Sequence, residues 1–211
     1  MKKNFLLFFI FFISAIGLGK SYYGISYIPR ENIGIPTAFA DEFSLKNGVL
    51  FCGGGGTVKI SNIFIGGDNF SGKVLTDNGK YKFSIEKISA IVGTSLNFFG
   101  RISFDTGISF GEITHKITAS VNGTNTINDF LNGDSSYGNT IKKEYSFIGA
   151  NASVNIYPQK FLGVYVNFSY NIGYSQNGWV FEINPEIHVI NDNTDKYTVF
   201  YEISSGITFD F

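Results

Sequence analysis

The chain has 211 residues and a formal net charge of −1. It is long enough for one domain with a sizeable core, and it lacks the basic excess typical of proteins that bind nucleic acids. It contains 25 Gly, 23 Phe and 12 Tyr but only one cysteine, Cys52. This composition favours strands and excludes an intramolecular disulfide, so we expect an all-β protein with Cys52 as a buried free thiol.

The N-terminus, MKKNFLLFFIFFISAIGLGKS, has two lysines before an apolar run and small residues after it. This layout is typical of a secretory signal peptide, and the apolar run is shorter than a membrane-spanning helix requires. We therefore expect residues 1–21 to be a signal peptide that is cleaved near Gly19 to Ser21. Residues 22–42 fit no strand pattern, and we expect them to form a lead-in segment before a β-barrel domain at 43–211.

Residues 51–74 read FCGGGGTVKISNIFIGGDNFSGKV, which approaches the phosphate-binding pattern G-x-x-x-x-G-K-[ST]. Gly67, Gly72 and Lys73 match it, but Val74 stands where a hydroxyl that binds magnesium is required. A turn and another strand pattern follow, instead of the helix that would hold the phosphate. We therefore predict no nucleotide site and no cofactor, and we attribute the glycines to the tight bends and narrow interior of a sheet that closes on itself.

Apolar and polar residues alternate through most of the remaining chain, as in residues 162–174, LGVYVNFSYNIGY. Alternation of period two is typical of strands with one apolar and one polar face. The alternation changes phase near Lys87–Ile88 and near Glu112–Ile113, which predicts β-bulges. A long polar loop is expected at 119–141. The turn signals predict about eight strands, at 49–61, 63–75, 80–98, 100–118, 143–157, 161–176, 179–190 and 197–211.

The closing segment, YTVFYEISSGITFDF, has large apolar residues at every second position except Ser205 and ends on a phenylalanine. An exported, alternating chain with this ending resembles the small, porin-like outer-membrane β-barrels of the OmpA and OmpX type over residues 43–211. The resemblance implies an antiparallel, closed transmembrane β-barrel in the cell outer membrane. It also implies two partners, the membrane lipid and the barrel-assembly machinery. The assembly machinery would recognise a C-terminal signal formed by Tyr201, Ile203, Ile207, Phe209 and Phe211.

Physical reasoning leads to the same barrel. Closure satisfies every backbone group in lipid, apolar faces point outward, and an eight-stranded interior is filled by side chains. Eight strands counted back from the C-terminus, however, place the 119–141 loop on the periplasmic side, where such barrels have short turns. A further strand formed through the VNGT turn signal at Val121, or a soluble sandwich, would remove this conflict, and the alternative count is about nine or ten strands with residues 22–42 included. The polar faces are predicted to form an interior network of Arg101, Asp105, Asn151, Asn155, Asn167, Asn171, Glu182, Glu186 and Glu202.

Three classes of function remain open from the sequence. The favoured one is an outer-membrane barrel with a structural, adhesive or envelope-integrity role and an unidentified external ligand, with narrow-pore transport as a variant. The second is a secreted soluble β-barrel or sandwich that binds a small apolar ligand between inward-facing apolar faces. The third is a barrel-embedded lipid-modifying hydrolase that uses His188 beside Glu186. No G-x-S-x-G motif supports it, and the histidines lack a complete set of metal ligands, so we expect neither enzyme activity nor a metal site.

Overall fold

A computed structural model describes residues 19–29, 48–75, 81–119, 140–183, 185–186 and 196–210. Among these residues, no helix is long and apolar enough to cross a membrane. The described part contains nine strands: β1 (Gly19–Ile28), β2 (Val49–Ile60), β3 (Ile63–Leu75), β4 (Tyr81–Phe98), β5 (Ile102–Ala119), β6 (Thr140–Ile156), β7 (Leu162–Tyr174), β8 (Val180–Phe181) and β9 (Tyr197–Asp210).

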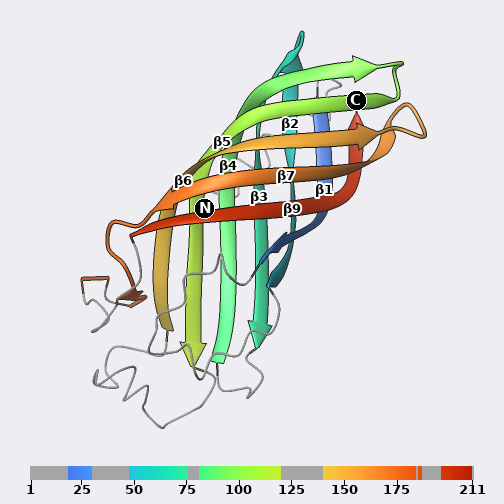
Figure 1. The fold of residues 1–211 in the computed structure, drawn as a ribbon. Coiled ribbons are helices and arrows are strands. Elements are labelled where there is room, and N and C mark those ends of the chain that lie inside the picture. Colours follow the sequence, from blue (N-terminus) through green and yellow to red (C-terminus); the bar gives the residue numbers. More distant parts are fainter. Residues whose placement is uncertain are drawn as a thin grey trace.

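All the strands except β8 close into an antiparallel barrel (Figure 1). The order runs β5-β4-β3-β2-β1-β9-β7-β6, and the pairing of β5 with β6 closes the ring. The short strand β8 pairs with one end of β6, through Ile141 and Lys142. The closed antiparallel β-barrel expected from the sequence is therefore confirmed, and closure leaves its backbone groups paired all round.

The first barrel strand is not where the sequence analysis placed it. Residues 19–28, assigned to the signal peptide and the lead-in segment, form β1, which pairs with β2 on one side and with β9 on the other. In its described residues, 179–183 and 185–186, the strand expected at 179–190 contributes only β8. The two errors cancel in the number of strands, but they change the topology. The domain boundary at residue 43 is therefore wrong, because the barrel begins with β1. The predicted signal peptide before residue 19 lies outside the described residues.

The two ends of the barrel have different connections. One end, which we term the turn end, holds the start of β1, the end of β9 and three short turns at 61–62, 99–101 and 157–161. The other end, the loop end, is where the strands that flank the longer connections stop. β5 ends and β6 begins at the loop end, away from the start of β1 and the end of β9. The conflict over the side of the 119–141 loop is resolved because β8 does not cross the barrel, so three barrel strands, β6, β7 and β9, follow the loop instead of the four that were expected.

The outward faces of β4, β5 and β6 change character along their length. Near the turn end they are apolar, and Ile108, Phe110 and Ile148 are 52%, 52% and 58% exposed. Beyond these residues toward the loop end, the outward side chains are polar, as at Glu112 and Lys142. We term the apolar outer band the belt, formed by the outward side chains of residues 88–98, 102–110, 148–156, 162–174 and 197–209. We term the part that projects past it the head, formed by residues 81–86, 111–118, 140–147 and 180–181.

The interior shows the opposite arrangement. In the head it is filled by an apolar core that includes Phe83, Ile113, Tyr145 and Phe181, all at most 3% exposed. The ladder between β4 and β5 is unbroken and passes directly through Lys87–Ile113 and Ile88–Glu112. The predicted β-bulges are therefore wrong. The phase changes mark the point where apolar side chains switch from the outer face to the inner face.

Candidate functional site

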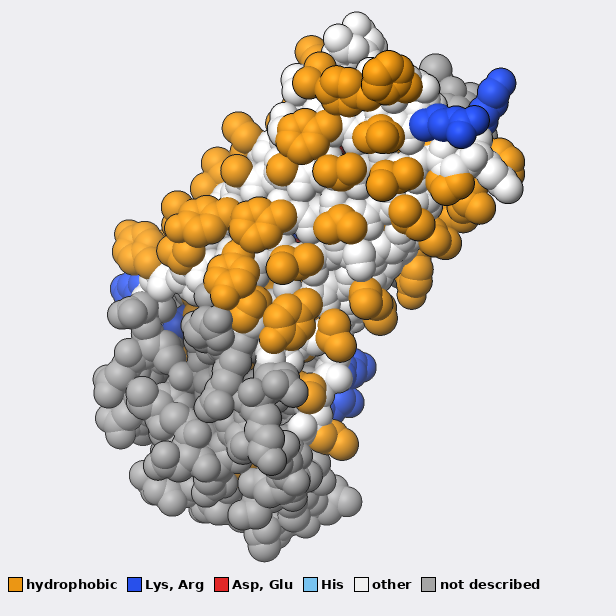
Figure 2. All heavy atoms as spheres, turned by 45° about the vertical axis from the view of Figure 1, so that its right-hand side comes forward, with side chains coloured by type: hydrophobic (Ala, Val, Ile, Leu, Met, Phe, Trp, Pro, Cys, Tyr) orange, Lys and Arg blue, Asp and Glu red, His pale blue; other side chains and the backbone are white. Residues whose placement is uncertain are grey.

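The belt is the most extensive exposed apolar surface of the described residues. On β7, every second residue from Val164 to Tyr174 is large and apolar or aromatic, and these side chains are 41% to 56% exposed. Figure 2 shows apolar side chains spread over the outside of the barrel, with Lys and Arg toward its two ends. A soluble monomer rarely exposes a contiguous apolar surface of this extent, whereas a lipid-facing barrel requires one.

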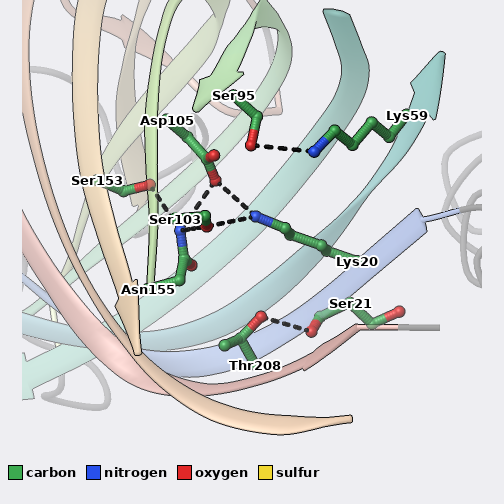
Figure 3. Close-up of polar contacts among 9 residues, drawn as sticks. All are labelled: Lys20, Ser21, Lys59, Ser95, Ser103, Asp105, Ser153, Asn155 and Thr208. Atoms are coloured by element: carbon green, nitrogen blue, oxygen red, sulfur yellow. Dashed lines mark hydrogen bonds and ion pairs between the residues drawn. The ribbon is translucent and has the colours of Figure 1, made fainter. Parts of the chain in front are cut away.

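A polar cluster lies inside the barrel near the turn end (Figure 3). The Lys20 Nζ of β1 donates to Ser103 Oγ at 2.8 Å and pairs with Asp105 Oδ2 at 3.0 Å. Asn155 of β6 donates to the same two oxygens, at 3.1 Å and 2.9 Å. Because β1 and β5 lie on opposite sides of the ring, these contacts join the two walls of the barrel across its interior.

A second ionic cluster lies deeper, between this network and the head. Lys87 Nζ is 2.7 Å from Glu202 Oε2 and 3.6 Å from Asp68 Oδ2. The Ser26 hydroxyl donates to Glu202, and the Ser89 hydroxyl donates to Asp68. One ammonium thus serves two carboxylates that are almost completely buried, with hydroxyl donors for their remaining lone pairs. A buried ionic group is stable only when it is partnered in this way.

Glycines make room for the aromatic side chains of the interior. A Cβ at Gly55 would lie 2.7 Å from the Tyr22 hydroxyl oxygen, and one at Gly24 would lie 2.6 Å from that of Tyr165. The Tyr22 and Tyr165 rings pack edge to face, with centroids 5.3 Å apart. Close approach therefore accounts for part of the glycine content of β1 and β2. The segment that approaches a phosphate-binding motif is the extended strand β3, and the next described element is the strand β4.

The interior is filled rather than open. A cavity of about 70 Å³ remains between the two ionic clusters, lined by polar side chains that include Lys20, Asp68 and Asp105. It has room for a few water molecules. On the loop side of this cavity, the head core, with Trp179 and Phe83 fully buried, occupies the barrel. Within the described residues, the interior is therefore a packed core with a small polar cavity.

Six of the nine residues predicted for the interior network line the interior: Asp105, Asn151, Asn155, Asn167, Asn171 and Glu202. Asn167 donates to Ser204 at 3.3 Å, and Asn171 donates to Ser169 at 3.1 Å. The other three, Arg101, Glu182 and Glu186, are exposed.

Their exposure has a clear structural cause. Arg101 belongs to the turn between β4 and β5, and Glu182 and Glu186 follow the end of β8 instead of lying on a strand. Glu182 instead pairs with Lys116 on the outside of the head, at 2.5 Å.

Three of the residues that hold the interior together were not predicted from the sequence. Lys20 was assigned to the signal peptide, Lys87 stood at a change of phase, and Asp68 lay in the segment examined for phosphate binding. The signal that would have found Lys87 and Asp68 is their position on the inward face of β4 and β3. That face becomes evident only when the alternation is extended unbroken through both segments.

His115, the histidine that the structure describes, lies beside the apolar core of the head. His115 is 3% exposed, and its ring packs edge to face against Phe83 and Tyr145. Burial and the nearby Lys143 ammonium lower the pKa of His115 to about 3. Its Nδ1 has no hydrogen-bond partner among the described residues. His188 lies outside the described residues. Cys52, expected to be buried, is exposed on the outward face of β2, because Phe51 takes the inward position.

The residues predicted to form a C-terminal assembly signal share one face of β9. Ile203 and Ile207 are 48% and 45% exposed, and Tyr201 and Phe209 on the same face are partly buried. Phe211 lies outside the described residues. Their role in assembly stays a prediction. The described residues include no group of three or more His, Cys, Asp or Glu able to hold a metal ion.

The fold is that of a small eight-stranded outer-membrane β-barrel. Neisserial surface protein A has a similar structure, with a TM-score of 0.56 and 8% sequence identity over 92% of this chain and 97% of that one. Ail, the attachment invasion locus protein of Yersinia pestis, solved in complex with the heparin analogue sucrose octasulfate, gives a TM-score of 0.50 and 10% identity over 91% and 99% of the two chains. Comparison with protein-family models finds no match, and comparison with curated protein sequences finds none.

Proposed function

We propose that this chain is an outer-membrane β-barrel protein with a structural or adhesive role at the cell surface. The belt carries the proposal, because a closed barrel with a broad apolar outer band and an ion-paired interior is stable in a lipid bilayer and not in water. In this orientation the turn end faces the periplasm, and the head projects from the outer surface. The names of the two similar proteins, a surface protein and an attachment protein, are in keeping with such a role.

The packed interior favours this role over narrow-pore transport. Two ionic clusters and the head core leave only a small polar cavity in the described part of the barrel. Purified protein in a planar bilayer should therefore give no discrete conductance steps. Steady single-channel currents would restore the narrow-pore alternative.

A soluble barrel that binds an apolar ligand is less consistent with the same observations. Its apolar faces would have to point inward all along the strands, whereas those of β7 and β9 point outward. The head core does point inward, but its side chains fill the space themselves. The hydrolase alternative rests on His188 and is tested directly: loss of a lipid-hydrolysis activity in a His188→Ala variant would support it.

Membrane fractionation together with electrophoresis of unboiled and boiled samples tests the main proposal. Recovery in the outer membrane and a heat-dependent shift in mobility are expected for a closed barrel. A soluble protein without a shift would contradict the proposal.

The same preparation tests the signal peptide by mass spectrometry of the mature chain. Because the Lys20 side chain pairs with Asp105, cleavage should leave Lys20 in place, at or before the Gly19–Lys20 bond. A mature chain that begins at Ser21 would contradict this expectation.

A further inference from the structure

A polar cavity of about 220 Å³ lies on the side of the head, at a break in the sheet. β7 pairs with β6 only as far as Ser146–Tyr174, and β8 rejoins β6 at Lys142. Between these two pairings, residues 175–179 cross from the end of β7 to β8 and leave a hollow beside β6. We term this hollow the β6 pocket. The β6 pocket follows from the topology, because the neighbour of β6 changes there from β7 to β8.

The lining of the β6 pocket is rich in groups that accept and donate hydrogen bonds. Glu112 of β5 and Glu144 of β6 contribute carboxylates, and Gln176 and Asn177 contribute amides. Lys142 Nζ pairs with Glu144 Oε1 at 3.0 Å. Glu112 has no ionic partner among the described residues, so the lining carries a net negative charge.

A buried hydroxyl provides an independent sign that the β6 pocket holds a ligand. Ser175 lines the pocket and is 1% exposed, yet its Oγ has no hydrogen-bond partner among the described residues. Leaving such a group unsatisfied costs free energy, and native proteins nearly always avoid that cost. Its backbone N–H is already used, donating to the Lys196 carbonyl at 2.8 Å. The hydroxyl oxygen is enclosed by its neighbours, so a ligand group in the pocket reaches it after a small shift of these side chains.

The rim adds an aromatic surface. Tyr174 lines the pocket, and its ring lies 5.1 Å from that of Tyr197, centroid to centroid, at an angle of 44°. The two side chains are 41% and 69% exposed. Both stand at the upper edge of the belt, where a membrane surface would lie if the proposed function holds. Tyrosine at this boundary presents an apolar ring and a polar hydroxyl together.

We propose that the β6 pocket binds one sugar residue that is either uncharged or carries an ammonium group. Sugar hydroxyls both donate and accept, which matches a lining of carboxylates, amides and a free serine hydroxyl. The apolar face of a sugar ring can rest on an exposed tyrosine. The unpaired Glu112 carboxylate attracts an ammonium group and repels sulfate or phosphate. The placement at the membrane surface, though not the chemistry, rests on the proposed outer-membrane location.

Ligand binding is measured on the full chain in detergent micelles with three probes: N,N′-diacetylchitobiose, glucosamine and glucose 6-phosphate. Saturation-transfer NMR reports ligand contact. The only tryptophan, Trp179, lies next to the pocket-lining residues Gly178 and Val180, so its fluorescence gives a second readout. We expect the first two probes to bind and glucose 6-phosphate to bind at least about tenfold more weakly. Absence of binding by both unphosphorylated sugars, or equal binding of all three probes, would overturn the proposal.

A matched pair of variants locates the binding. Glu112→Gln removes the unpaired carboxylate and should weaken glucosamine binding about tenfold, because a charge-assisted hydrogen bond becomes a neutral one. Glu86→Gln makes the same change on the outward face of β4, outside the pocket, and should bind like the wild type. Ser146→Phe fills the pocket and should abolish binding. Undiminished binding in Glu112→Gln would overturn the proposal even if Ser146→Phe failed to fold.

Two lipid environments identify the source of the sugar. If lipopolysaccharide in the bilayer suppresses chitobiose binding relative to plain phospholipid, then the membrane glycolipid occupies the pocket. If it does not, the pocket serves free or host glycans. The heat-dependent gel shift of the same samples reports on the proposed function separately. A folded membrane barrel that binds no sugar would therefore overturn only the proposal that the β6 pocket binds a sugar residue.

Discussion

The belt region and the head are two parts of one sheet in which apolar and charged side chains are distributed in opposite ways between the inner and outer faces. At the level of the belt, apolar side chains face outward, and Lys87, Glu202 and Asp68 are buried inside. In the head, Phe83 and Tyr145 are buried inside, and charged side chains face outward. The β4–β5 ladder continues through the boundary without interruption. Which face of a strand carries the apolar side chains thus depends on the medium on each side of the sheet. A change of phase in the alternation marks a change of that medium.

The two regions should differ in what stabilises them. The head resembles a small soluble core, whose stability comes from apolar burial in water. The belt region depends on a few ion pairs that are costly to disrupt in a low-dielectric interior. Four substitutions test this contrast.

Lys87→Met should have the largest effect. It leaves the Glu202 and Asp68 carboxylates buried without a counter-charge, which costs about 3–5 kcal/mol of unfolding free energy. Urea titration of the heat-dependent gel shift measures this loss. Lys82→Met, an outward-facing change on the same strand in the head, is the control and should alter stability by less than about 0.5 kcal/mol. Equal effects for the two variants would show that the interior cluster is not stabilising.

Ile108→Lys and Thr114→Lys compare the outer faces of the two regions on β5. Ile108 belongs to the belt, where a lysine facing lipid costs about 2–4 kcal/mol. Thr114 faces outward in the head, where a lysine should change the free energy of unfolding by about 0.5 kcal/mol or less. The measurement is unfolding in phospholipid bilayers. Similar losses at both positions would contradict the boundary drawn between belt and head.

The head should be the pH-sensitive region. The pKa of His115 falls from its ordinary value of 6.5 to about 3 in the folded chain, because burial disfavours the imidazolium and Lys143 repels it. Folded-state stability is therefore fully present above pH 6.5 and is lost as pH falls toward 3, by about 2 kcal/mol between pH 6.5 and pH 5. Urea unfolding followed by Trp179 fluorescence measures this loss of stability. His115→Phe should remove this slope, and its persistence in that variant would assign it to other groups.

Lys20→Met should have the smallest effect of the four, about 1–2 kcal/mol. Asp105 loses its ion pair but keeps the hydrogen bond from Asn155 at 2.9 Å, so the carboxylate is not left without a donor. Asp105→Asn in the same background should restore part of the loss. A loss as large as that of Lys87→Met would mean that the turn end is as tightly coupled as the central cluster.

Long, regular alternation made much of the fold predictable from the sequence. The outward faces of β7 and β9 follow from ten or more residues of alternation. A segment that alternates over this length fits few structures other than a strand. β1 was missed because it is short, has tyrosines on both of its faces (Tyr22 and Tyr23), and directly follows a segment that resembles a signal peptide. The head was missed because its apolar residues point inward, so the pattern there was interpreted as a local defect.

The interior contacts were only partly predictable, for a different reason. Inward-facing polar residues such as Asp105 and Glu202 could be identified by their strand positions. Their partners could not, because the distance from Lys20 to Asp105 depends on the registers of every strand between β1 and β5. One error in strand assignment changes which residues meet across the barrel.

The exposed thiol of Cys52 gives the molecule a built-in marker of depth. It is the only cysteine in the chain and faces outward on β2, where a labelling reagent meets no competing site. A thiol reacts as the thiolate, which lipid disfavours and water permits. Its rate of reaction with a charged, membrane-impermeant maleimide in intact cells would therefore measure how far this side of the barrel rises out of the bilayer, without any engineered residue.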